Sequence, residues 1–172
     1  MKKILPLFAA LLCLFACNRA PKTPTSDELA LTIDSVEKQL AGVYIENVDT
    51  NTSNRIVELY VQYADLFPSD TAAPVYLHKA AQWAESMGRI DDMVQYYNRV
   101  IENYPNYSKL DECFYSKGIA LDNAGRKEEA RKAYMEFLDE YPDHFLADDI
   151  RKAIALLDMS DEMLLKFLSS QE

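Results

Sequence analysis

The sequence predicts an all-α protein, a solenoid of stacked antiparallel helix pairs, because two features recur with one period. An aromatic residue followed by proline closes an apolar helical stretch at Phe67-Pro68, Tyr104-Pro105 and Tyr141-Pro142, and successive prolines are 37 residues apart. A glycine followed by arginine recurs with the same spacing, at Gly88-Arg89 and Gly125-Arg126. A fixed period of roughly 20 to 50 residues is typical of repeat arrays, in which each helix pair buries its apolar face on the next pair.

Residues 1–16 have the features of a secretory signal peptide. Lys2 and Lys3 precede an apolar run from Ile4 to Ala16, which is shorter than the roughly 20 residues that a transmembrane helix needs. The run leads into Leu14-Phe15-Ala16-Cys17, which resembles the bacterial lipobox. This resemblance implies cleavage before Cys17 and attachment of lipid to Cys17. The alternative is an ordinary cleaved signal, with Cys17 as an incidental thiol.

Residues 17–25 are expected to form a lipidated, proline-containing tether, because Pro21 and Pro24 favour an extended chain of about 3.1 Å per residue. The full chain carries a net charge of −10, and cleavage would change this to −12 by removing Lys2 and Lys3. Such an acidic chain disfavours binding to nucleic acid and to anionic lipid head groups. Membrane attachment would therefore depend on the acyl chains at Cys17.

Residues 26–172 are predicted to form one helical repeat domain whose first pair spans about 27–68. After Ser26, a candidate N-cap, apolar residues recur in steps of three and four, which predicts one helix ending near Asp49 and weakened by Gly42. A turn at 49–54 is expected next, with Asn51 one period before Gly88. Asparagine is the residue type that tolerates a left-handed turn conformation next best after glycine. The second helix is expected at 54–67.

The second and third pairs, near 74–105 and 109–142, are predicted with greater clarity. Their helices are expected at 74–87, 91–104, 109–124 and 128–141, and each pair turns at a glycine that can adopt the left-handed conformation without strain. A C-terminal cap near 144–169 would consist of helices at 144–157 and 161–168, with charged residues on its outer face. The alternative for the last helix is contact with a neighbour or a second copy.

The third pair resembles the tetratricopeptide repeat. The matching residues are Gly118, Gly125, Ala130, Tyr134 and Pro142. The second pair is similar through Leu77, Ala81, Gly88, Tyr97 and Pro105, although Met93 stands where the family usually has alanine. The longer spacing is similar to that of tetratricopeptide lipoproteins in the Gram-negative envelope. The resemblance implies a non-catalytic protein that binds a peptide or protein partner in a concave groove.

In tetratricopeptide arrays the first helix of each pair lines the groove through its second, fifth, ninth, twelfth and thirteenth positions. Carried over by register, these positions hold Val75, His78, Gln82, Glu85, Ser86, Glu112, Tyr115, Ile119, Asp122 and Asn123. The first pair would add Lys38, Ile45 and Val48, and the terminal helix Lys152 and Leu156. Their mixed acidic, aromatic and aliphatic character favours a partner segment with basic and apolar residues. A merely solvated face is the alternative.

Catalysis, a cofactor and a metal site are not expected. His78 and His144 lie in different repeats, and neither has a ligand at metal-binding spacing within its helix. The acidic doublets at 91–92, 128–129 and 148–149 fall in the first turns of predicted helices, where the helix dipole stabilises carboxylates. After loss of Cys13 and lipidation of Cys17, only Cys113 remains, so the mature chain has no internal disulfide. Cys113 lies on an apolar helix side and is interpreted as a buried hydrophobe.

These observations predict a lipid-anchored adaptor in a bacterial cell envelope. The outer membrane is the favoured location, because Asn18 follows the lipidated cysteine in place of the aspartate that retains many lipoproteins at the inner membrane. Whether the protein faces the periplasm or the cell surface, and its oligomeric state, stay open. The alternative function is an accessory subunit of a transport or glycan-processing complex that binds a small molecule or glycan. Such sites favour exposed aromatic rings, whereas the single tryptophan, Trp83, is expected to pack between helices.

Overall fold

A computed structural model of the protein describes residues 22–159 and Met163. The signal peptide, the lipidated Cys17, the start of the tether and the helix predicted at 161–168 lie outside the described residues. The described part contains seven α-helices, one 3₁₀ turn and no strand. They are α1 (Ser26–Leu40), η1 (Ile45–Asn47), α2 (Thr50–Leu66), α3 (Ala73–Ser86), α4 (Ile90–Asn103), α5 (Leu110–Asn123), α6 (Lys127–Glu140) and α7 (Ala147–Leu157).

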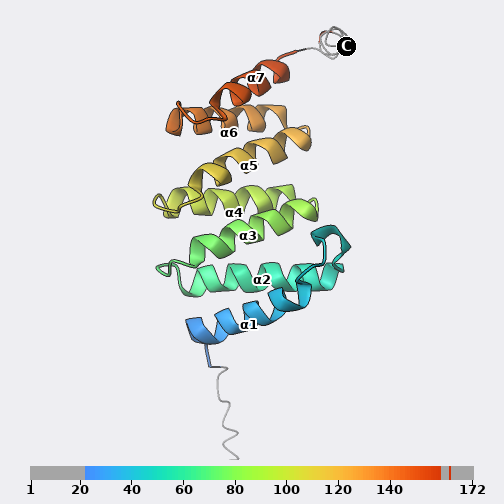
Figure 1. Ribbon diagram of the computed structural model, residues 1–172, viewed down its shortest axis with the longest axis vertical. Coiled ribbons are helices and arrows are strands. Elements are labelled where there is room, and N and C mark those ends of the chain that lie inside the picture. The colour runs from blue at the N-terminus through green and yellow to red at the C-terminus, as the bar shows by residue number, and fades with distance from the viewer. Residues whose placement is uncertain (1–21, 160–162, 164–172) are drawn as a thin grey trace, which may run out of the picture.

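The helices stack in chain order as antiparallel hairpins, with each helix packed against its sequence neighbours (Figure 1). This arrangement confirms the predicted all-α solenoid. In the second and third pairs, α3 to α6, every predicted helix boundary agrees with the structure to within one residue. The corners that lead from one pair to the next lie together at one edge of the stack, and the turns within pairs lie at the opposite edge.

The three aromatic-proline corners have the same backbone geometry. Phe67, Tyr104 and Tyr141 have φ between −129° and −132° and ψ between 56° and 62°. The amide of each donates to the carbonyl four residues earlier, at 2.8 to 2.9 Å. The proline that follows disfavours the helical conformation for the aromatic residue and has no N–H with which to extend the helix. The helix therefore stops at the same point in each repeat.

The turns within the second and third pairs also share one conformation. Gly88 and Gly125 have φ of 69° and 72°, in the left-handed region that glycine adopts without strain. The following residues, Arg89 and Arg126, donate their amides to carbonyls five residues earlier at 2.8 and 2.9 Å. These bonds satisfy carbonyls that the helix end would otherwise leave unpaired.

Both turn arginines join neighbouring repeats. Arg126 donates to Asp91 at 2.6 Å, and Arg89 donates to Asn54 at 3.0 Å. Asn54 and Asp91 are one period apart, so the turn arginine makes the same contact in both repeats. The acceptor is a neutral amide at Asn54 and a carboxylate at Asp91. Each arginine also donates to a carboxylate three residues later in its own helix. Repeats are thus connected at the turn edge as well as through the apolar core.

The first pair departs from the prediction. The expected helix to Asp49 is wrong: α1 ends at Leu40, and Gly42 adopts a φ of 80°, so it reverses the chain and does not merely weaken the helix. Thr25 and not Ser26 is the N-cap, in a capping box with Glu28.

The predicted turn at Asn51 is also wrong. Asp49 accepts hydrogen bonds from the amides of Asn51 and Thr52, which starts α2 at Thr50 and places Asn51 in its first turn. Among the described residues every positive φ belongs to a glycine. The first pair therefore turns at Gly42, and the longer connection that follows contains the 3₁₀ turn η1.

The terminal helix α7 begins at Ala147, three residues later than predicted. His144 takes part in a third corner, where its amide donates to Tyr141 and its Nδ1 accepts from the amide of Leu146 at 3.2 Å. The corner after Tyr141-Pro142 has the same length as the corners after Phe67-Pro68 and Tyr104-Pro105. The prediction started the helix at His144, inside this corner.

The outer side of α7 is polar where α5 is apolar. Phe114 and Leu121 of α5 correspond, one period later, to Arg151 and Asp158. Arg151 pairs with Asp148 at 2.8 Å, and Asp158 pairs with Arg131 of α6. Two positions that are apolar in α5 are therefore polar and ion-paired in α7 and at its C-cap.

The core has one position at which a methyl group cannot fit. A Cβ placed on Gly118 would lie 2.6 Å from two ring carbons of the fully buried Tyr134. Contacts that short do not occur between carbon atoms in folded proteins, so helix α5 or the ring would have to move. Gly118 permits the close approach of α5 and α6.

Gly118→Ala is expected to lower the free energy of unfolding by about 1–3 kcal/mol, because overpacking displaces the Tyr134 ring. Urea denaturation followed by circular dichroism measures the change. Gly88→Asn serves as the control, because Gly88 faces open space and asparagine tolerates its positive φ. A loss for Gly118→Ala no larger than that for Gly88→Asn would contradict the packing argument.

Candidate functional site

The predicted groove residues of the second and third pairs come together along the junction of α3 and α5. His78 Nε2 of α3 lies 3.7 Å from Glu112 Oε1 of α5 and 3.4 Å from Gln82 Nε2. Lys109 Nζ, just before α5, lies 3.0 Å from the other oxygen of Glu112. The register assigns ten residues to the groove, five within 75–86 of α3 and five within 112–123 of α5. We call the surface that these residues form the α3–α5 face.

His78 forms the floor of this face and is not an exposed contact residue. Its side chain is 4% exposed, and its ring makes edge-on contacts with Tyr97 and Tyr107. Nδ1 lies 3.2 Å from the Tyr107 hydroxyl. Burial lowers the pKa of His78, and the positive charge of Lys109 adds to this effect, while Glu112 opposes it.

Tyr115 and Ile119 of α5 are half-buried and therefore serve the core as well as the surface. The Tyr115 ring meets Phe137 edge-on, with centroids 6.4 Å apart, and Ile119 packs against the hydrophobic core. Asn123 is exposed, as is Gln82 on α3. The exposed amide side chains are thus the predicted groove residues best placed to touch a partner without disturbing the fold.

Two acidic residues of the face, Glu85 and Asp122, occupy equivalent positions one period apart. Asp122 Oδ2 accepts a hydrogen bond from the Tyr134 hydroxyl at 3.2 Å. The carboxylate of Glu85 has no hydrogen-bond or ion-pair partner within the described residues, although the side chain is half-buried. This burial raises the pKa of Glu85.

The predicted groove residues at the two ends of the array lie apart from the α3–α5 face. Lys152 pairs with Asp149 inside α7 at 2.9 Å, and Lys38 pairs with Asp34 inside α1 at 2.6 Å. Leu156 lies near the end of α7 and is partly exposed.

The placement of Ile45 and Val48 on the first helix is wrong, because α1 has already ended. Ile45 lies in η1, and Val48 follows it. Together with Ser86 at the end of α3 they line a pocket of about 410 Å³ at the turn edge.

The acidic doublets lie in the first turns of α4, α6 and α7, as predicted. Their carboxylates pair with arginine or lysine side chains, for example Asp92 with Arg89 at 2.6 Å and Glu129 with Arg126 at 2.6 Å. Cys113 is fully buried, and burial raises the pKa of its thiol to about 12. A thiolate is the reactive form of cysteine, so this environment disfavours a nucleophilic role.

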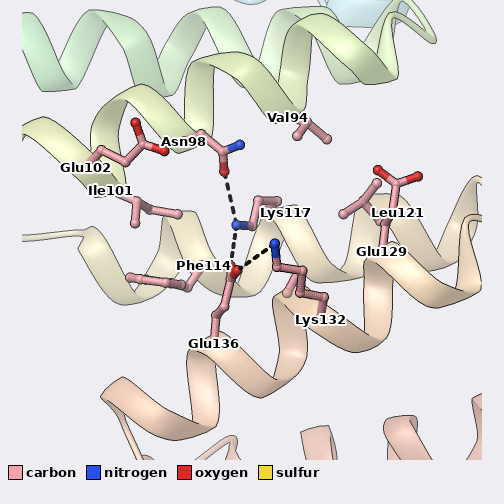
Figure 2. A pocket seen from close by; sticks show the side chains of 11 residues that line it. Val94, Asn98, Ile101, Glu102, Phe114, Lys117, Leu121, Glu129, Lys132 and Glu136 are labelled. Carbon is pink, nitrogen blue, oxygen red and sulfur yellow. Dashed lines mark hydrogen bonds and ion pairs between the residues drawn. The ribbon is translucent and has the colours of Figure 1, made fainter.

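The structure reveals one buried charge that the sequence analysis did not single out. Lys117 of α5 enters a pocket of about 410 Å³ between α4 and α6, as Figure 2 shows. Its Nζ lies 2.7 Å from Glu136 Oε2 and 3.1 Å from Asn98 Oδ1. The residues one period before and after it are Ala80 and Ile154. A lysine at a position that is otherwise apolar was the signal that could have identified it.

The charge of Lys117 is matched by a carboxylate of the protein itself. Glu136 accepts from Lys117 and lies 3.9 Å from Lys132 (Figure 2). Glu129 pairs with Arg126. A buried ammonium group needs such compensation, because removing it from water is costly. We therefore assign Lys117 a structural role at the junction of the second and third pairs.

Within residues 22–159 and Met163, no group of three or more histidine, cysteine or acidic side chains could hold a metal ion. The helices in the same residues are too short or too polar to cross a bilayer.

Comparison with known proteins supports the resemblance inferred from the residues. The family model of the tetratricopeptide repeat matches residues 76–107 and 112–144. Over these segments the chain is similar to tetratricopeptide repeats. The segments comprise the helix pairs α3–α4 and α5–α6, and the α3–α5 face belongs to their two first helices. No curated protein matches the chain. Tetratricopeptide repeats are typically non-catalytic modules that bind protein partners, and solenoids present extended surfaces for this purpose.

The lowered pKa of His78 predicts a stability that decreases as the pH falls below about 7.5. In the unfolded chain this histidine titrates near 6.5, whereas the folded protein binds fewer protons at the buried ring. The free energy of unfolding should therefore fall as the pH decreases through 6.5 toward the lower folded-state value. In His78→Gln the contribution of residue 78 to this pH-dependent decrease in the free energy of unfolding should be absent. Urea denaturation at several pH values measures both slopes.

A constant difference in stability between His78→Gln and the parent protein at all pH values does not affect this test, since only the slope reports protonation. Equal slopes in the two proteins would contradict the assignment to His78.

Proposed function

We propose that the protein is a lipid-anchored adaptor of a bacterial cell envelope, which binds a segment of a peptide or protein partner along the α3–α5 face. The tetratricopeptide repeats at 76–107 and 112–144 carry the proposal of a protein partner. The face that they form combines exposed amides, unpaired or weakly paired carboxylates and half-buried apolar side chains. Such a mixture suits a polypeptide partner, because it offers hydrogen bonds to a backbone and apolar contacts to side chains.

The sequence of residues 1–25 supports the envelope location. Two lysines, a short apolar run and Cys17 at a lipobox-like cleavage site together favour export and lipid attachment. Asn18 favours the outer membrane. The acidic charge of the whole chain makes electrostatic adhesion to anionic lipids unfavourable, so the anchor would have to be the acyl chains.

The glycan-binding alternative receives less support from Trp83 and from the aromatic residue of the α3–α5 face. Trp83 is only partly exposed and packs against the core. Tyr115, the aromatic residue of the α3–α5 face, is also half-buried against Phe137. Glycan sites favour broadly exposed rings that can stack on a sugar.

Cys17→Ser is expected to abolish incorporation of labelled palmitate and to move the protein from the membrane fraction to the soluble fraction. Metabolic labelling in a bacterial host, followed by fractionation, measures both effects. Cys113→Ala is the matched control, since Cys113 is buried in the repeat core and should not affect labelling. Absence of label in the unaltered protein would defeat the lipid-anchor proposal.

The groove proposal predicts position-specific crosslinking. A photoreactive benzoylphenylalanine at exposed Gln82 or Asn123 should capture one discrete partner in intact cells, and the same residue at exposed Gln95 of α4 should not. Mass spectrometry of the adducts identifies the captured polypeptide. Adducts from Gln95 alone would reject the α3–α5 face. No adduct from any position, together with saturable sugar binding by the purified protein, would favour the glycan-binding alternative.

A further inference from the structure

Two tyrosine–acid pairs occupy equivalent places in the second and third repeats, and only one pair is complete. Tyr134 and Asp122 of the third repeat correspond to Tyr97 and Glu85 of the second, each one period earlier. The Tyr134 hydroxyl donates to Asp122 at 3.2 Å. The Tyr97 hydroxyl is buried and has no hydrogen-bond partner within the described residues. The second repeat therefore contains the tyrosine hydroxyl and the carboxylate, but no hydrogen bond connects them.

Each of the two unpaired groups is costly in the free protein. Tyr97 is 0% exposed, so its hydroxyl has lost water without gaining a hydrogen bond. Ser116 lies near enough to influence the pKa of Tyr97 but makes no hydrogen bond with it. The carboxylate of Glu85 is half-buried, and its negative charge acts on the Tyr97 hydroxyl. A buried polar group without a partner destabilises a fold, because it has lost its hydrogen bonds to water.

The surroundings of Glu85 favour a cationic ligand. Asp122 and Glu112 of α5 add further carboxylates to the face, and the whole chain carries a charge of −10. Lys109, which comes just before α5, is already paired with Glu112 at 3.0 Å. A carboxylate that is partly removed from water and lacks a counter-ion attracts an ammonium or guanidinium group strongly, because water screens the pair less.

The residues beside Glu85 suit a polypeptide as the bearer of that cation. Gln82 and Ser86 lie within one helical turn of it and are exposed, and Asn123 is exposed near the end of α5. Their side chains can both donate to and accept from a peptide backbone. An extended segment lying along α3 and α5 would thus place one basic side chain over Glu85.

We propose that Glu85 anchors the partner by binding a lysine or arginine side chain of the partner polypeptide. This inference rests on the proposed adaptor function and identifies the chemistry of the partner segment. The paired Asp122 serves as the internal reference: its carboxylate is already held by Tyr134 and contributes less to binding. The affinity should fall as the salt concentration rises, since the contact joins opposite charges at a partly exposed site.

The test uses N-acetyl-lysine methylamide as a probe of the full chain in detergent micelles, followed by ¹⁵N chemical-shift changes. The probe should shift amide signals of residues 82–88, and the uncharged analogue N-acetyl-norleucine methylamide should not. Glu85→Gln preserves the size of the side chain and should weaken probe binding at least about tenfold. Glu102→Gln, at an exposed position on α4, is the matched control and should bind as the parent does.

The same variants separate this inference from the adaptor proposal. In the crosslinking experiment at Gln82, Glu85→Gln should reduce the yield of the partner adduct, whereas Glu102→Gln should not. An unchanged adduct yield in Glu85→Gln, with equal shifts from the lysine and norleucine probes, would overturn the inference and leave the adaptor function standing. If probe binding depends on Glu85 but no partner is captured, the inference about Glu85 would stand and the adaptor function would be contradicted. Circular dichroism and thermal unfolding of Glu85→Gln verify that the fold is retained.

Discussion

The structure depends on one constraint: a single helix hairpin has too much apolar surface to bury by itself. In the described residues each inner hairpin covers the preceding one on one side and is covered by the following one on the other. This works only if successive hairpins are in phase, and the identical corner geometry at Phe67, Tyr104 and Tyr141 keeps them so. Proline after each aromatic residue stops the helix at a constant point, and burial of the apolar faces then supplies the stabilisation.

The same phase relation determines where the polar groups lie. The turn arginines reach back by one repeat at one edge of the stack, and the α3–α5 junction brings His78 close to Glu112. Residues that are distant in sequence thereby form one continuous face. A rigid array of this kind can bind a partner without paying the entropy of ordering the binding surface, which is a general advantage of preorganised sites.

Departures from the repeat are as informative as the repeat itself. Gly118 permits a close helix approach, Lys117 introduces a compensated buried charge, and Glu85 stands beside a tyrosine with which it does not pair. The first two have a structural explanation within the chain. The pair of Glu85 and Tyr97 has no such explanation, because the Glu85 carboxylate and the Tyr97 hydroxyl are both left without a hydrogen bond. The contrast between Glu85 and Asp122 is the basis of the proposal that Glu85 binds a cationic side chain of the partner.

The sequence by itself determined the fold class, the period and the four helices of the second and third pairs. These features follow from local signals, namely apolar spacing, proline and glycine, which act within one or two helical turns. The first pair was harder to predict, because Gly42 could weaken or end a helix, and capping by Asp49 decided where α2 begins.

Only the tertiary structure decided which of the predicted groove residues are accessible. His78 is the floor of the face because α5 and Tyr107 cover it, and Ile45 lies in η1 because α1 has already ended. Lys117 and the unpaired groups of Tyr97 and Glu85 depend on atoms from two or three helices at once. Burial and hydrogen bonding across repeats are properties of the packed array, so no pattern within a single helix could establish them.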